Sequence, residues 1–296
     1  MPDTFSRYHP LVNFVYFALV FAFSMVFQHP ACLLISLTLA CVYAARLNGK
    51  RALRFALKGV LPLMLVCAAV NPLFNHRGMT ILWYFPGGNP LTMESIAYGF
   101  AAAAMLAAVM TWFSCFHRVF TSDKFIYLFG RVIPGLSLVL SMTLRFVPRF
   151  RAQLRAVTAA QKCVGRDPAA GGLVQRARRA VTVFSIMVTW ALENGVDTAD
   201  SMKSRGYGLP GRSAFSIYRL TGRDKLALTV LAALGACVIA GGALGWLDFH
   251  YFPALGAETR LHEMILCLAA YALLCALPVW IDDWEDRKWK RIQSNI

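Results

Sequence analysis

Long apolar runs separated by short polar segments make up most of the chain. Six of these runs are close to the about 20 residues that a helix needs to cross the hydrocarbon core of a membrane. They cover residues 11–27, 30–45, 55–74, 95–116, 226–246 and 263–281. With 58% hydrophobic and 15% charged residues, the chain is too apolar for a soluble domain of this length. The pattern predicts an all-α integral membrane protein with about six transmembrane helices.

The segment between the fourth and fifth runs does not fit this pattern. Residues 125–147 are apolar but contain Arg131 and Arg145, which predicts a helix lying in the inner interface rather than a span. The next apolar positions step by four, four and three residues: Phe146, Phe150, Leu154 and Val157. Most of the nearby Lys and Arg residues lie outside this apolar stripe, which is typical of a basic amphipathic helix.

Two long helices in this segment are predicted to end at similar signals. The first ends at Gly165, before Asp167-Pro168, and the second begins near Leu173 and ends at Gly206, before Pro210. Residues 180–192 form the apolar centre of the second helix, and they are too few to span a membrane. We therefore expect four spans in residues 1–116, cytoplasmic or interfacial coupling helices in 117–225, two spans in 226–281 and a tail in 282–296.

The ends of these two helices are the candidate functional sites. In residues 203–206, KSRG, the glycine supplies the positive φ that stops a helix, and Arg205 projects at the tip. Lys162-Cys163-Val164-Gly165 has the same form 41 residues earlier. Arg205 could simply cap its own helix, and a basic layer on anionic lipids needs no ordered tips. Docking onto a partner with two equivalent sites explains more of the pattern.

The charge distribution predicts the orientation of the chain. The net charge is +15, and residues 117–225 hold 18 Lys and Arg against six acids. The loop 46–58 adds five cations and no acid, whereas the segments 75–94 and 248–262 are close to neutral. Because cytoplasmic loops carry the excess of Lys and Arg, we expect the N-terminus, the loop 46–58, the region 117–225 and the C-terminus to be cytoplasmic.

Other functional classes are disfavoured by what the sequence lacks. The eight cysteines have no CxxC or paired spacing, the six histidines form no HExxH, and no acid lies in the middle of a span. No GxxxxGK[ST] loop is present, so ATP would be handled by a partner. We expect no catalytic residue, metal, cofactor or nucleic-acid partner. The remaining alternatives are a self-sufficient secondary transporter and a membrane scaffold with a lipid-binding basic region.

Four segments resemble a known family. They are residues 120–123 (FTSD), 140–148 (LSMTLRFVP), 160–162 (AQK) and 201–207 (SMKSRGY), and they are similar to the transmembrane T component of energy-coupling factor (ECF) transporters, the EcfT/CbiQ type. The resemblance runs from His9-Pro10 to about Lys225. It implies a multi-pass protein of the prokaryotic cell membrane with no catalytic activity of its own.

The resemblance also implies a mechanism and partners. Each of two helix tips would dock into one of two ABC-type ATPase subunits, and the helices would pass ATP-driven motion to a small substrate-binding (S) subunit that binds a vitamin or metal ion. Ser204-Arg205-Gly206, supported by Lys203, matches the second tip motif. Cys163-Val164-Gly165 occupies the first, with Val164 where the family has Arg. Either Arg166 or Lys162 replaces that arginine, or the first tip is engaged mainly by packing.

Overall fold

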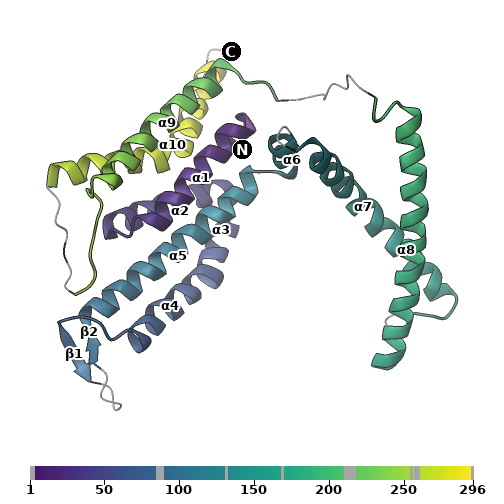
Figure 1. The fold of residues 1–296 in the computed structure, drawn as a ribbon, viewed down its shortest axis with the longest axis horizontal. Helices are drawn as coiled ribbons and strands as arrows, with labels where there is room; N and C mark the ends of the chain where they lie inside the picture. The colour runs from purple at the N-terminus through teal and green to yellow at the C-terminus, as the bar shows by residue number, and fades with distance from the viewer. Residues whose placement is uncertain are drawn as a thin grey trace. The chain divides into compact units, whose positions relative to one another are not determined.

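The computed structural model describes residues 4–84, 90–130, 133–167, 170–209, 218–253, 256 and 261–294. The chain divides into two compact units, Met1–Phe125 with Tyr218–Ile296, and Ile126–Ile217. We describe each unit by itself (Figure 1). Arg131, Pro168 and Pro210, which contributed to the expectations above, lie outside the described residues.

The first unit holds the apolar helices. Five helical segments are long and apolar enough to cross a membrane: Pro30–Asn48, Lys50–Phe74, Met93–Val119, Gly222–Ala243 and Leu261–Gln293. A shorter apolar helix, α1 (Pro10–Val26), precedes them. Helix α5 (Met93–Val119) packs against α1, α2 (Pro30–Asn48) and α4 (Leu61–Phe74), and α9 (Gly222–Ala243) packs against α1 and α10 (Leu261–Ser294). The all-α membrane class is confirmed.

Three details differ from the predicted boundaries. The expected loop 46–58 is almost entirely helical, because α2 continues to Asn48 and α3 (Lys50–Phe55) begins directly after Gly49, whose φ is 52°. A five-residue π-helical segment, Ala56–Val60, then joins α3 to α4. The expected outer loop contains a two-stranded antiparallel sheet, β1 (Ile81–Tyr84) and β2 (Pro90–Thr92). Helix α10 runs from the last apolar run through the charged tail without interruption.

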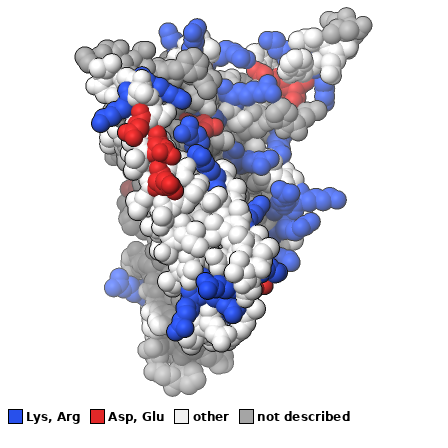
Figure 2. Space-filling model, turned by 90° about the vertical axis from the view of Figure 1, so that its right-hand side faces the viewer, with Lys and Arg blue, Asp and Glu red and all other residues white. Residues whose placement is uncertain are grey.

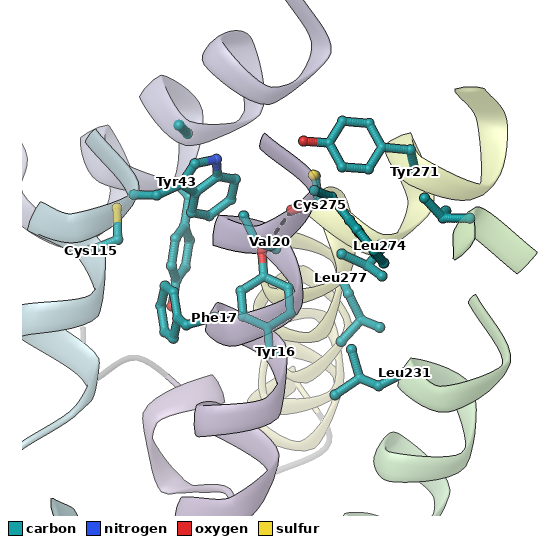
Figure 3. Close-up of a cluster of buried hydrophobic side chains, with 14 of the residues drawn as sticks. Tyr16, Phe17, Val20, Tyr43, Cys115, Leu231, Tyr271, Leu274, Cys275 and Leu277 are labelled. Atoms are coloured by element: carbon teal, nitrogen blue, oxygen red, sulfur yellow. Dashed lines mark hydrogen bonds between the residues drawn. The ribbon is translucent and has the colours of Figure 1, made fainter. Parts of the chain in front are cut away.

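Aromatic side chains and a chain of hydroxyl groups hold the first unit together. Trp112 of α5 is fully buried, lies 6.1 Å from Tyr16 between ring centroids, and donates its indole N–H to Ser36 Oγ at 3.0 Å. Ser36 in turn pairs with Ser24 at 2.8 Å, and Ser24 with Tyr271 at 3.1 Å. Tyr16 donates to the Cys275 carbonyl at 3.1 Å, as the dashed line in Figure 3 shows. The network links α1, α2, α5 and α10.

Acidic side chains of α10 connect it to three other segments at the same end of the unit. The pairings are Asp282 Oδ1 with the N–H groups of Thr4 (3.0 Å) and Phe5 (3.2 Å), Asp283 with Arg46 (2.6 Å), and Glu285 with Arg223 (2.7 Å). The start of the chain, the end of α2, the start of α9 and the charged end of α10 are therefore neighbours. These segments lie at one end of the bundle.

The second unit consists mainly of two long helices. Helix α6 (Ser122–Gly130) begins in the first unit, and its residues from Ile126 onward belong to the second unit. Helix α7 (Pro134–Cys163) passes through Pro148 as one helix, so the interfacial and amphipathic segments predicted separately are continuous. Helix α8 (Leu173–Ser204) has the predicted start near Leu173.

The burial of Trp112 leads to a stability prediction. Replacing Trp112 with Ala removes a fully buried side chain and the partner of Ser36, so we expect destabilisation of about 3–5 kcal/mol. The neighbouring Phe113 is 46% exposed, and Phe113→Ala should have a much smaller effect. Thermal unfolding of the purified variants in detergent measures both. Equal melting temperatures for the two variants would contradict this account of the core.

Candidate docking tips on two crossed helices

The end of α7 is closed by its own backbone. Gly165 adopts a φ of 76°, and its N–H donates to the Lys162 carbonyl at 3.0 Å. The N–H of Arg166 donates to the Gln161 carbonyl at 2.9 Å. This pair of hydrogen bonds is the Schellman motif, which satisfies carbonyl groups left unpaired at a helix C-terminus. Only glycine adopts the required left-handed conformation without strain.

The end of α8 has the same geometry. Gly206 has a φ of 77°, its N–H donates to the Lys203 carbonyl at 3.0 Å, and Tyr207 N–H donates to Met202 at 3.0 Å. The residue before each glycine is the C-cap, with φ −83° and ψ 8° at Val164 and φ −86° and ψ 10° at Arg205. Val164 and Arg205 therefore occupy equivalent positions. The sequence comparison of the two tips is correct in register.

The predicted tip residues are accessible. Lys162, Cys163, Val164, Gly165, Arg166, Lys203, Ser204 and Arg205 are all exposed, and Gly206 is half-buried. Val164 presents 72% of its surface to the surroundings. Lys162 Nζ lies 3.5 Å from Asp167 Oδ2, so its charge is partly compensated within its own tip. Ser204 Oγ donates back to the Ser201 carbonyl at 2.9 Å.

A hydrogen-bonded connection holds the segment after the first tip. Arg179 of α8 donates through Nη1 to the carbonyl groups of Asp167 and Ala170, both at 2.8 Å. One guanidinium thus fixes the chain that follows Gly165 to the first turns of α8. The first tip is therefore positioned by the second helix as well as by its own cap.

The two helices contact each other near their middles. The rings of Phe150 on α7 and Trp190 on α8 meet edge to face, with centroids 5.2 Å apart. Arg149 lies 6.0 Å from the centroid of the same Trp190 ring. Grooves lie on both sides of this contact, one of 540 Å³ and one of 710 Å³. The smaller groove is lined by α7 residues 150–158 and α8 residues 180–191. The larger groove is lined by α7 residues 138–149 and α8 residues from 194 onward, so the two helices run antiparallel.

The larger groove connects the second tip to α7. It is lined by Arg205, Gly206 and Tyr207 from the tip and by Arg145 and Arg149 from α7, with Asp197 of α8 as a carboxylate. The sequence analysis did not associate the two α7 arginines with Arg205. Arg145 and Arg149 are four residues apart, which places both on one helix face. This spacing was the signal in the sequence that could have marked them as a pair.

An exposed apolar stripe runs along α8, and two of its residues, Phe184 and Val188, also line the smaller groove beside α7. It consists of Val181, Phe184, Val188 and Leu192, with 66%, 68%, 40% and 68% of their surfaces exposed. Figure 2 views the second unit from the side on which α8 lies in Figure 1, and a white uncharged surface there extends between blue and red side chains. A stripe with this spacing is the face by which a helix packs against a partner.

The cap by itself does not mark a docking site, because α9 ends in the same way. Gly245 has a φ of 76°, Trp246 N–H donates to Gly241, and the C-cap is Leu244. That end is apolar and follows a spanning helix. What distinguishes the two tips of the second unit is their basic, exposed side chains. Among the described residues, no group of three or more His, Cys, Asp or Glu side chains could hold a metal ion.

Comparison with known proteins decides the family. Residues 7–217, more than half of the chain, match the CbiQ family, which is described as cobalt transport protein. The chain belongs to the CbiQ family. It is thus a multi-pass membrane protein of the ECF transporter T-component type, as the four matching segments implied.

Curated relatives carry the same designation. The energy-coupling factor transporter transmembrane protein EcfT of Bacillus selenitireducens is 24% identical over 252 residues, 81% of this chain and 93% of that protein. EcfT of Staphylococcus aureus is 23% identical over 76% of this chain and 92% of that protein. EcfT of Lactobacillus helveticus is 30% identical over a shorter stretch, 34% of this CbiQ-family chain and 37% of the relative.

The glycine caps generate a matched prediction on α8. Gly206→Ala forces a left-handed alanine whose Cβ would lie 3.1 Å from Leu209 Cδ1, so the last turn should fray. Gly195→Ala lies in the helix interior with nothing within 4 Å of the added Cβ, and it should stabilise α8 by about 1 kcal/mol. Hydrogen–deuterium exchange of residues 201–207 should accelerate in the first variant only. Unchanged exchange in Gly206→Ala would show that the cap does not hold the tip.

Proposed function

We propose that this chain is the coupling subunit of an ECF-type importer, with its two helix tips docked into a pair of ABC-type ATPase subunits. The observation that carries the proposal is the identical closure of α7 and α8 at two exposed ends with equivalent C-cap residues. Two equivalent tips fit a partner that presents two equivalent grooves. The names of the relatives support membership in such a transporter.

Arg205 is suited to bind a carboxylate of the ATPase. Its guanidinium stands at a helix C-terminus, where the helix dipole favours a cation. It can donate two parallel hydrogen bonds to one carboxylate, which a lysine cannot do. Arg145 and Arg149 line the groove beside it and add positive charge toward an acidic partner surface. The second tip therefore docks mainly through electrostatic contacts.

The first tip docks mainly through packing. Val164 is apolar and 72% exposed, so covering it in a groove removes apolar surface from water. Arg166 follows the glycine and is exposed, whereas Lys162 is already near Asp167. Arg166 is thus the better candidate for a secondary ionic contact. The two ATPase sites are engaged by different chemistry at equivalent backbone positions.

The crossed helices transmit the motion of the ATPases. Helix α7 has 30 residues and α8 has 32, which corresponds to lengths of about 45 and 48 Å. The contact between Phe150 and Trp190 joins them at the middle. The exposed stripe on α8 packs against the S subunit, which binds the vitamin or metal ion and sets the substrate. The tips and both chain ends face the cytoplasm of a prokaryotic cell, consistent with the basic charge of residues 117–225.

Reversing the charge of Arg205 tests the second tip. We expect Arg205→Glu to weaken co-purification with the ATPase pair by more than about 30-fold, because a like charge replaces a bidentate cation. Arg155→Glu, an exposed charge reversal in the interior of α7, is the matched control and should retain assembly. Unchanged ATP-driven uptake in Arg205→Glu would remove this tip from the mechanism. Solute transport by the purified chain alone would refute the coupling role.

Restoring the family residue tests the first tip. We expect Val164→Arg to retain or strengthen ATPase binding, because the new arginine would stand at the C-cap of α7, the position that Arg205 occupies on α8. Val164→Asp should weaken binding, since it places a charge where the proposal buries an apolar side chain. Pull-down of the ATPase subunits from membranes measures both variants. A clear loss of assembly in Val164→Arg would contradict the proposed equivalence of the two tips.

A further inference from the structure

A narrow groove between α9 and α10 has no role in the docking of ATPases. It has a volume of 310 Å³ and lies in the first unit. Leu226, Ala227, Val230, Leu277 and Ile281 form its apolar walls, Trp280 and Trp284 border it, and Tyr8 and Arg223 add a hydroxyl and a guanidinium. Most of these residues belong to α9 and α10, two helices that are long and apolar enough to cross a membrane.

The position of the two tryptophans indicates the level of the groove in the membrane. Trp280 and Trp284 are 73% and 61% exposed, and they lie where the apolar part of α10 gives way to its charged end. Tryptophan gathers at the level of lipid headgroups. The apolar walls thus lie at the depth of acyl chains, and Arg223 lies at the depth of phosphate groups.

Charge at the mouth of the groove favours an anion. Three of the four acids at this end of α10 are paired within the protein, since Asp282 and Asp283 bind other segments and Glu285 keeps only 17% of its side chain exposed; the fourth, Asp286, is exposed. The Arg223 side chain remains 70% exposed while Nη1 contacts Glu285, so several of its five N–H donors face outward. Lys288 Nζ lies 5.7 Å from the Trp284 ring centroid. Arg287, Lys290 and Arg291 of the same helix end are also exposed.

We propose that this groove binds one anionic phospholipid, with an acyl chain along the apolar walls and the phosphate beside Arg223 and Lys288. An apolar trough with cations at one end matches an amphipathic anion. The bound lipid would join α9 to α10 next to the Arg223–Glu285 pair.

Native mass spectrometry of the purified full chain tests the proposal, with palmitoyl-oleoyl phosphatidylglycerol and the matching phosphatidylcholine as probes. We expect selective retention of one phosphatidylglycerol. Arg223→Gln should weaken this retention about fivefold, the effect of one cation near a lipid surface, and Arg223→Lys should recover most of it. Arg219→Gln is the control, an exposed arginine outside the groove.

Filling the groove provides a second, independent arm. Val230→Trp should displace the lipid, whereas Ile239→Trp, at a 55% exposed position of the same helix outside the groove, should not. Equal retention of both lipids by the unmodified chain would overturn the proposal. So would normal phosphatidylglycerol retention in Val230→Trp. A photo-crosslinker at Leu226 that captures protein instead of lipid in native membranes would show that a partner subunit occupies the groove.

Discussion

A helix that ends in a polar environment leaves its last carbonyl groups without partners inside the helix. Both long helices of the second unit meet this constraint by turning the chain at a glycine, so that two N–H groups fold back onto the last turn. The turn also determines which side chain stands at the end. Val164 and Arg205 are exposed at equivalent positions because Gly165 and Gly206 directly follow them. The proposed docking function depends on this backbone geometry.

The first unit satisfies a related constraint inside the membrane, where water cannot pair with polar groups. Hydroxyl groups of Ser24, Ser36 and Tyr271 bind one another, and the indole N–H of Trp112 completes the network. The polar atoms are thereby paired across four helices, α1, α2, α5 and α10. The network joins these helices into one bundle.

The charged end of α10 serves both the frame and its surroundings. Three of its acids, Asp282, Asp283 and Glu285, bind the N-terminal segment, α2 and α9, which ties the bundle together on one side. Its cations point outward, toward the lipid headgroups in our proposal. At the tips of the second unit, one C-cap is apolar and the other cationic, so the two ATPase contacts that we propose would differ in chemistry although the backbones match. The division of charge in both units separates groups that hold the fold from groups that meet other molecules.

The sequence by itself determined the membrane class, most helix boundaries and the two tips, because each rests on a local signal. About 20 apolar residues specify a span, and a glycine after a basic turn specifies a helix end, as Gly165 and Gly206 illustrate. Local signals failed where neighbouring segments decide the conformation: the cationic stretch 46–58 is helical, and the expected outer loop contains the strands β1 and β2.

Only the tertiary structure brought Arg145 and Arg149 beside Arg205, joined Phe150 to Trp190, and formed the groove between α9 and α10. These features require residues far apart in the chain to meet. Their positions depend on how the helices pack, which no single stretch of sequence specifies.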